Sequence, residues 1–368
     1  MDGGGGGRRP RAVFMAFGTR GDVFPIAALA AAFAQDQRQY SVVFITHSAH
    51  QSLSTHLADC NVRYMPVSSP PVLAAEQLKS ISCDSVQSNA EHDSFSQRKK
   101  IIQVEHRKEC LSAVENVFGN DMSTHGDFIV INFFALEGWH LAELFQVKCI
   151  IAAPYFVPYS APASFERQFK QSLPLLYKYF QEAPLNMDPV TNLPLWYMRE
   201  ESPLLLYGFS KEIVECPVAE SSEYQASALH CDSNILFNGR LFCFSGWLFP
   251  KCAIAIHHAG SGSTAAALFA GIPQISCPFL LDQFYWAERL HWLGVAPEPL
   301  RRQHLILDTD NASSINNAAD MLIGAIKSAL SPEIKAQATR IANKLSSEDG
   351  IGEALRILKE RVLPQSES

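Results

Sequence analysis

The stretch from residue 253 to residue 283, AIAIHHAGSGSTAAALFAGIPQISCPFLLDQ, decides the fold of this chain. Its short apolar run at 253–257 predicts a buried strand. A turn with two glycines follows, and then an alanine-rich segment, 265–270, of high helix propensity. Gly271 ends that helix, and 274–277 predicts a second strand. The order of strand, glycine-rich turn, helix and strand indicates an α/β fold with a parallel sheet.

The turn within this stretch has the residue types that bind a phosphate. Glycine lets the backbone approach an anion, and the free N–H groups at a helix start point toward it. Ser263 and Thr264 add hydroxyl donors, and either would also cap the helix. His258, two residues before Gly260, would donate a hydrogen bond to a phosphate oxygen. The residues alone leave open a second interpretation, in which the turn and helix bind no ligand.

Beyond the turn, the motif continues at fixed spacing. The sequence H-x-G-x-x-S-T is followed by G-x-P, by P and by D-Q, which resembles the donor-binding signature of nucleotide-sugar glycosyltransferases of the GT-B type. HHAGSGSTAAALFAGIPQ and CPFLLDQFYWAERLHWLGVAP are most similar to the plant-type sterol glucosyltransferase branch. The resemblance implies two Rossmann-like domains with parallel sheets. It also implies a site for the donor diphosphate, formed by His258, Gly260, Ser263 and Thr264. A site for the donor sugar is implied at Asp282 and Gln283.

A second strand–turn–helix unit lies near the other end of the chain. Residues 12–17, AVFMAF, predict a buried strand, and GTRGDVFP at 18–25 leads into a helix over about 26–35 and a strand at 41–46. Ligands of such units bind at the carboxyl ends of the strands, where 18–22 falls. The turn is not G-x-G-x-x-G, and no acidic residue closes the second strand. A nicotinamide-dependent dehydrogenase is therefore poorly supported.

GTRGDVFP resembles a motif at the start of the acceptor-binding domain in the same glycosyltransferase branch. By that resemblance Asp22 is the general base, which must reach the acceptor hydroxyl. An aspartate has an unperturbed pKa of about 3.9, so it would take the proton as the sugar bond breaks. The residues alone favour another role, in which Asp22 caps the following helix. Thr19 and Arg20 are candidates for contacting a phosphate or orienting Asp22, and a solvated Arg20 is the alternative.

Composition limits the function classes. The 368 residues suggest about two domains, and 47% hydrophobic content is enough for real cores. A net charge of −7 gives no reason to expect a nucleic-acid partner. The nine cysteines are odd in number and never spaced C-x-x-C, which favours reduced thiols in the cytoplasm. We expect no metal and no cofactor, the UDP-sugar being a co-substrate. Peripheral membrane contact would suit a sterol enzyme, although no basic amphipathic helix argues for it.

The domain organisation follows from these motifs. We expect a disordered tail at 1–10, an acceptor-binding Rossmann-like domain at 11–215 and a shortened linker at 216–233. An incomplete donor-binding domain at 234–346 and a C-terminal helix with a tail at 347–368 complete the chain. Relatives carry the first donor-domain strands and the linker where this chain has only 217–234. The loop at 244–250, which lines the base pocket in relatives, is also altered. Ala259 replaces their usual glycine, and we expect its methyl group to crowd the phosphate.

The remaining pattern completes the two domains. We expect a long loop over 70–98 and an aromatic, proline-rich segment at 154–203 that suits either an acceptor pocket or interdomain packing. Further strands are expected at 126–132, 148–152 and 204–210, and further helices at 101–118, 136–145, 284–292, 315–330, 333–345 and 352–362. His106, His125 and His140 belong to no pattern that assigns them chemistry.

Together the motifs predict an inverting transfer of a hexose, glucose by resemblance, from a UDP-sugar to the hydroxyl of an apolar acceptor such as a sterol. The alternative is a catalytically inactive variant that binds a sterol or lipid in residues 11–210 without a working donor site.

Overall fold

A computed structural model of the chain describes residues 8–69, 88–119, 124–153, 204–207, 210, 213, 248–279, 283–301 and 312–363. The chain divides into two compact units. The first consists of Met1–Ala152 with Leu355–Ser368, and the second of Ala153–Ala354. The division differs from the boundaries expected at 215 and 347, since the end of the chain returns to the first unit.

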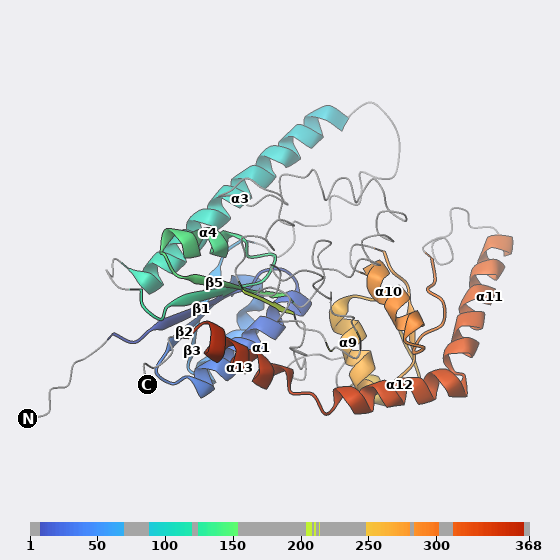
Figure 1. Cartoon of the computed structure of the whole chain (residues 1–368). Coiled ribbons are helices and arrows are strands. Elements are labelled where there is room, and N and C mark those ends of the chain that lie inside the picture. Colours follow the sequence, from blue (N-terminus) through green and yellow to red (C-terminus); the bar gives the residue numbers. More distant parts are fainter. Residues whose placement is uncertain are drawn as a thin grey trace, which may run out of the picture. The chain divides into compact units, whose positions relative to one another are not determined.

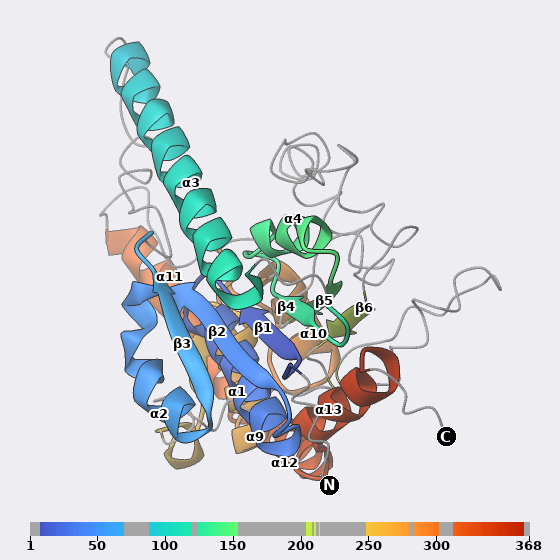
Figure 2. The ribbon, with the colours of Figure 1, turned by 90° about the vertical axis from the view of Figure 1, so that its left-hand side faces the viewer.

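The first unit is built on a parallel sheet. Its strands are β1 (Arg11–Met15), β2 (Ser41–His47), β3 (Val62–Val67), β4 (Phe128–Ile131) and β5 (Lys148–Ala153), which pair in parallel in the order β3-β2-β1-β4-β5 (Figure 2). The sheet order ends with β6 (Leu204–Tyr207), which falls in the residue range of the second unit. Val13 of β1 lies opposite Val43 of β2 and Ile129 of β4, so β1 is central. The expected α/β class is confirmed.

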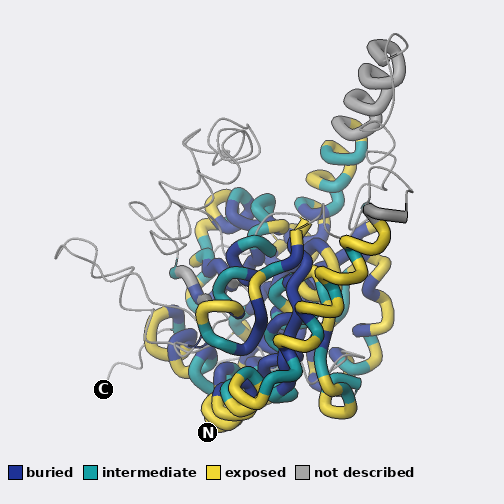
Figure 3. The backbone as a smooth tube through the Cα atoms, turned by 90° about the vertical axis from the view of Figure 1, so that its right-hand side faces the viewer, coloured by how far each residue is buried: buried dark blue, intermediate teal, exposed yellow. Residues whose placement is uncertain are grey.

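Helices cover both faces of this sheet, with α3 (Ser88–Phe118) and α4 (Glu137–Leu144) on one side and α1 (Arg20–Asp36) on the other (Figures 1 and 2). Strands enclosed in this way read as continuous apolar runs. Accordingly Ala12–Met15 and Phe128–Ile131 are fully buried. Phe14, Phe33 and Phe128 pack edge to face or tilted, with centroids 5.3–6.2 Å apart. Figure 3 colours the backbone by burial and shows buried segments inside more exposed ones.

Two helices begin earlier than the sequence indicates. α1 begins at Arg20 instead of near 26 because Thr19 caps it, and Pro25, which has no N–H to donate, lies inside the helix. α3 takes in 88–98, which we assigned to the loop from residue 70. That segment lacks apolar periodicity, but its Ala, Glu, Gln and Arg residues are good helix formers. The strand β3 and the helix α2 (Ser54–Asp59) were not expected.

The second unit contains the motif on which the sequence analysis rests. β7 (Ala255–His257) and β8 (Gln274–Ser276) pair in parallel and flank α9 (Ser261–Ala270), as expected. A core of Leu268, Tyr285, Trp286, Leu290 and Ile341 joins α9 to its neighbouring helices. The helices that follow in this unit are α10 (Gln283–Trp292), α11 (Ala312–Ala329) and α12 (Pro332–Leu345). The last helix, α13 (Gly350–Arg361), belongs from Leu355 on to the first unit.

The two ends of the chain differ from expectation. Residues 8–10, assigned to a disordered tail, contact the sheet, because Arg8 forms an ion pair with the buried Asp127 and the Pro10 carbonyl accepts Ser41 N–H at 2.8 Å. At the other end, Lys148 Nζ donates to the Val362 carbonyl at 3.0 Å. These contacts hold both ends on the first unit.

Several expectations fall on residues outside the described ranges. They concern residues 1–7 of the tail, the aromatic segment at 154–203, the linker at 216–233, the segment at 234–247 and Asp282. Within the described ranges, no helix is both long enough and apolar enough to cross a membrane.

Three histidines gather where β2 ends. The rings of His47 and His106 lie 5.9 Å apart, those of His47 and His50 6.3 Å apart, and the Phe17 ring lies 4.7 Å from His47 and 4.6 Å from His106. Burial lowers the pKa of His47 to about 4. Burial also lowers the pKa of His106, although the negative charges of Glu137 and Glu109 act to raise it. Burial in the folded state therefore favours the neutral form of His47 and of His106.

This cluster predicts acid sensitivity. In the unfolded chain a histidine titrates near pH 6.5, so between pH 6.5 and 4 the unfolded state binds more protons. The stability associated with neutral His47 is present above pH 6.5 and is lost as the pH falls toward 4. We expect a loss of about 2 kcal/mol between pH 7 and pH 5, measured by urea unfolding. His47→Gln should reduce that loss, and His125→Gln, at an exposed position, should not. An equal loss in wild type and His47→Gln would contradict the prediction.

Candidate functional site

The turn before α9, in the second unit, is one candidate site. Gly260 is the N-cap residue, with extended φ and ψ of −66° and 145°, and Thr264 N–H donates to its carbonyl at 3.0 Å. The expected side-chain cap by Ser263 or Thr264 is wrong, because the helix begins at Ser261 and places both residues in its first turn. The N–H groups before Thr264 in that turn have no partner within the helix. They can bind an anion.

Ala259 gives this turn its shape. Its φ of +61° is left-handed, which costs a residue with a Cβ about 1–2 kcal/mol. The residue is 0% exposed, and it packs in the core with Leu268 and Tyr285. The methyl group therefore lies in the core, and the expected crowding of a bound phosphate does not follow. A strained residue persists where its surroundings hold it in place.

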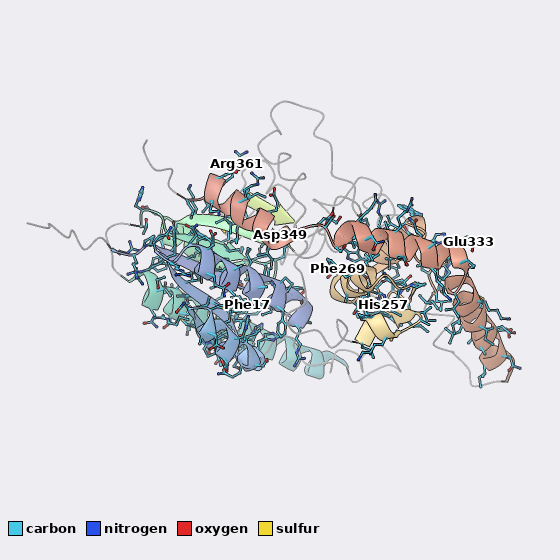
Figure 4. The ribbon with its side chains drawn as sticks, turned by 90° about the horizontal axis from the view of Figure 1, so that it is seen from below. Phe17, His257, Phe269, Glu333, Asp349 and Arg361 are labelled. Carbon is cyan, nitrogen blue, oxygen red and sulfur yellow. The ribbon has the colours of Figure 1, made fainter. Side chains whose placement is uncertain are left out.

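The ring of His257 supplies one of those supports. Ala259 N–H donates to Nδ1 of His257 at 3.0 Å, and Nε2 of the same ring lies 2.7 Å from Oε1 of Gln274. Burial lowers the pKa of His257, partly offset by the Gln274 bond. Figure 4 shows His257 beside the beginning of α9. The sequence analysis assigned no role to this histidine, although a histidine two residues before a left-handed position is a usable signal.

The four proposed diphosphate residues are not equivalent. His258 is exposed. A Cβ on Gly260 would lie 2.5 Å from Nε2 of His258, so glycine at position 260 leaves room for the imidazole ring at the start of the helix. Ser263 is partly exposed. Thr264 is only 1% exposed, and its Oγ1 has no hydrogen-bond partner among the described residues. His258, Gly260 and Ser263 therefore form the accessible part of the site.

Gln283, one of the two proposed sugar ligands, is the first residue of α10. Its Oε1 accepts the backbone N–H of Phe279 at 2.9 Å, which closes the loop between β8 and α10. Its neighbour Asp282 lies outside the described residues. Of the two proposed sugar ligands, only Gln283 therefore lies among the described residues.

The turn after β1, in the first unit, is a second candidate site. Oδ2 of Asp22 accepts hydrogen bonds from Thr19 N at 2.8 Å and from Thr19 Oγ1 at 2.7 Å, as in a capping box. The capping role that the residues favour is therefore present. Burial raises the pKa of Asp22, against the opposing effects of the Thr19 bonds and of His50. A raised pKa makes a carboxylate a better proton acceptor.

Gly18 and Phe134 lie against this carboxylate. Gly18 has φ of +108°, and a Cβ there would lie 2.7 Å from Asp22 Oδ2 and 2.9 Å from Phe134 Cδ2. Phe134 is 51% exposed, so the carboxylate has an accessible aromatic ring near it. The Arg20 guanidinium lies over the ring of Phe24, 5.9 Å from its centroid, and Thr19 is the residue whose contacts orient Asp22.

Asn132 holds the whole turn and was missed by the sequence analysis. It is 0% exposed, its Oδ1 accepts N–H groups of Phe17 and Phe134 at 3.2 Å, and its Nδ2 donates to the carbonyls of Phe17 at 2.8 Å and Asp22 at 3.1 Å. The amide thus uses two donor and two acceptor positions. The available signal was a polar residue directly after a buried strand. Among the described residues, no group of three or more His, Cys, Asp or Glu could hold a metal ion.

We compared the sequence and the fold of the chain with those of known proteins. Residues 229–359 match the family described as Erythromycin biosynthesis protein CIII-like, C-terminal domain. The chain is 36% identical over 123 residues to Sterol 3-beta-glucosyltransferase UGT80B1 of Arabidopsis thaliana. That match covers 33% of this chain and 18% of the plant protein, so the chain spans less than a fifth of that relative. It confirms the resemblance to sterol glucosyltransferases in the C-terminal part.

The fold extends the likeness to nearly the whole chain. The glycosyltransferase of kitacinnamycin matches with a TM-score of 0.58 at 13% identity, over 97% of this chain and 100% of that one. SsfS6, a glycosyltransferase of Streptomyces sp. SF2575 solved with thymidine diphosphate, matches with a TM-score of 0.50 at 14% identity, over 95% and 99% of the two chains. The chain therefore has the GT-B fold of these glycosyltransferases, and the sequence of its C-terminal part is similar to sterol glucosyltransferases.

Proposed function

We propose that the chain transfers a hexose, glucose from UDP-glucose, onto the hydroxyl of an apolar acceptor such as a sterol, with inversion at the anomeric carbon. The observation that carries this proposal is the accessible N-terminus of α9, with His258 exposed over it and Gly260 leaving room for that ring. Partly unpaired N–H groups and a helix dipole favour a diphosphate there. Similarity to a plant sterol glucosyltransferase supports the choice of acceptor.

In this mechanism the acceptor oxygen attacks the anomeric carbon while Asp22 takes the hydroxyl proton. The bond from that carbon to the phosphate oxygen breaks, and the electron pair leaves with UDP. Negative charge grows on the diphosphate as the bond lengthens, and the donors at the start of α9 stabilise it there. Burial favours the protonated form of Asp22 that results from the step.

A second candidate function is binding of a sterol or lipid without transfer. One observation favours it. Asp22 Oδ2 already accepts two hydrogen bonds from Thr19, which is the geometry of a helix cap. The two candidates differ in whether UDP binds and whether Asp22 is needed for turnover.

The first prediction concerns the base. Asp22→Asn should lower turnover by about 10²-fold or more while leaving the affinity for UDP unchanged, because an amide cannot accept the proton. The measurement is UDP release from UDP-glucose in the presence of a sterol. Asp36→Asn, at the other end of α1, serves as the matched control. Turnover retained in Asp22→Asn would remove this residue as the base.

The second prediction concerns the diphosphate. His258→Ala should weaken UDP binding by about tenfold, equivalent to about 1.4 kcal/mol, because one donor to a charged oxygen is lost. Titration calorimetry gives the affinity directly, and His125→Ala is the control at an exposed position. Unchanged affinity in His258→Ala would exclude its contact with the diphosphate. Wild type that binds a sterol but no UDP would support the second candidate function.

The third prediction concerns the acceptor. Phe134→Ala removes an exposed aromatic ring beside Gly18 and Asp22, so KM for an apolar acceptor should rise several-fold while the affinity for UDP stays the same. Leu144→Ala, which removes an exposed apolar side chain from α4, is the comparison. If both variants give the wild-type KM, the acceptor does not contact Phe134.

A further inference from the structure

We propose that His257 is a positioning residue for the donor turn, and that it works only as a neutral imidazole whose Nδ1 accepts the N–H of Ala259. In this role His257 does not contact the ligand. It holds the left-handed residue that directs His258 and the N-terminus of α9 toward the diphosphate. The inference rests on the proposed function, since it concerns how that same site is held.

The first argument is the geometry of the contact. His257 is the last residue of β7, paired with Ser276 of β8, and its Nδ1 lies 3.0 Å from the nitrogen of Ala259. A side-chain acceptor that binds the N–H two residues on is the arrangement of an Asx turn, in which asparagine or aspartate makes the same bond. The imidazole Nδ1 takes the place of the Asn Oδ1 oxygen here.

The second argument is the demand made by Ala259. The residue is 0% exposed and has φ of +61°, a conformation that needs support from its surroundings. Its methyl group is held by the core around Leu268. Its N–H is held by His257, and without that bond a buried donor would be left unsatisfied. Two contacts on opposite sides of the same residue thus maintain the turn.

The third argument is the tautomer. Gln274 is 0% exposed, and its Oε1 lies 2.7 Å from Nε2 of His257. Because an amide oxygen only accepts, Nε2 carries the proton and Nδ1 is left as the acceptor. Protonation of the ring would place a hydrogen on Nδ1, facing the N–H of Ala259, and would break the contact. Burial and the neighbouring His258 both oppose that protonation.

The test compares His257→Leu with His257→Asn in the full chain. Leucine cannot accept a hydrogen bond, so UDP should bind at least tenfold more weakly. Asparagine can make the Asx-turn bond to Ala259 N–H, so it should bind UDP within about threefold of wild type. Near-ultraviolet circular dichroism confirms that each variant is folded. Wild-type affinity in His257→Leu, or equal losses in the two variants, would overturn the inference.

A pH profile separates this role from simple packing. Gln274→Glu puts a carboxylate on Nε2, which stabilises the imidazolium and raises the pKa of His257. The loss of UDP affinity on acidification should therefore begin at a higher pH than in wild type, and the titration of UDP itself cancels in the comparison. Identical profiles would contradict the neutral-ring requirement.

A third readout keeps the inference distinct from the proposed function. Hydrogen exchange at the Ala259 amide should accelerate at least tenfold in His257→Leu and remain slow in His257→Asn, with or without nucleotide. If wild type fails to bind UDP, the proposed function fails, and exchange still reports whether His257 holds the turn. Unchanged exchange in His257→Leu would overturn the inference independently of any ligand.

Discussion

Parallel pairing of strands places the strand-to-helix turns of a sheet at the carboxyl ends of its strands, and each of the two candidate sites is one such turn. One follows β1 and presents Asp22, and the other follows β7 and presents His258. Each leads into a helix whose first N–H groups need partners. The chemistry available at each turn depends on how those groups are satisfied, by the chain itself or by a ligand.

The two turns meet this demand in opposite ways. At α1 the chain satisfies its own helix start, because Thr19 and Asp22 form a capping box. At α9 no side chain caps the helix, and Gly260 leaves the N-terminus open to an anion. Both turns need a left-handed residue, Gly18 in one and Ala259 in the other. Glycine adopts that conformation without strain, whereas alanine needs the contacts of its methyl group and its N–H.

Buried polar side chains from a neighbouring strand hold each turn. Asn132 follows β4 and binds the segment after β1 through three hydrogen bonds, two to Phe17 and one to Asp22. Gln274 in β8 sets the tautomer of His257 after β7. Burial raises the pKa of Asp22 and lowers those of His47, His106 and His257, so it favours the neutral form in every case. The same loss of hydration thus makes the Asp22 carboxylate a better proton acceptor and leaves Nδ1 of His257 unprotonated, so that it can accept a hydrogen bond.

The sequence by itself determined the α/β class, the strand–turn–helix–strand order around His258 and Asp22, and the likeness to sterol glucosyltransferases, because these depend on local apolar runs, glycines and spacing. It could not show that Ser263 and Thr264 lie inside the helix, or that Ala259 turns its methyl group into the core. Nor could it show that 88–98 is helical, since that segment has no apolar period. Only the tertiary structure decided that Asn132, His257 and Gln274 support the site. Asn132 and Gln274 act through contacts that packing, and not sequence spacing, brings within hydrogen-bond distance, whereas His257 binds the N–H two residues on once Ala259 adopts its left-handed conformation.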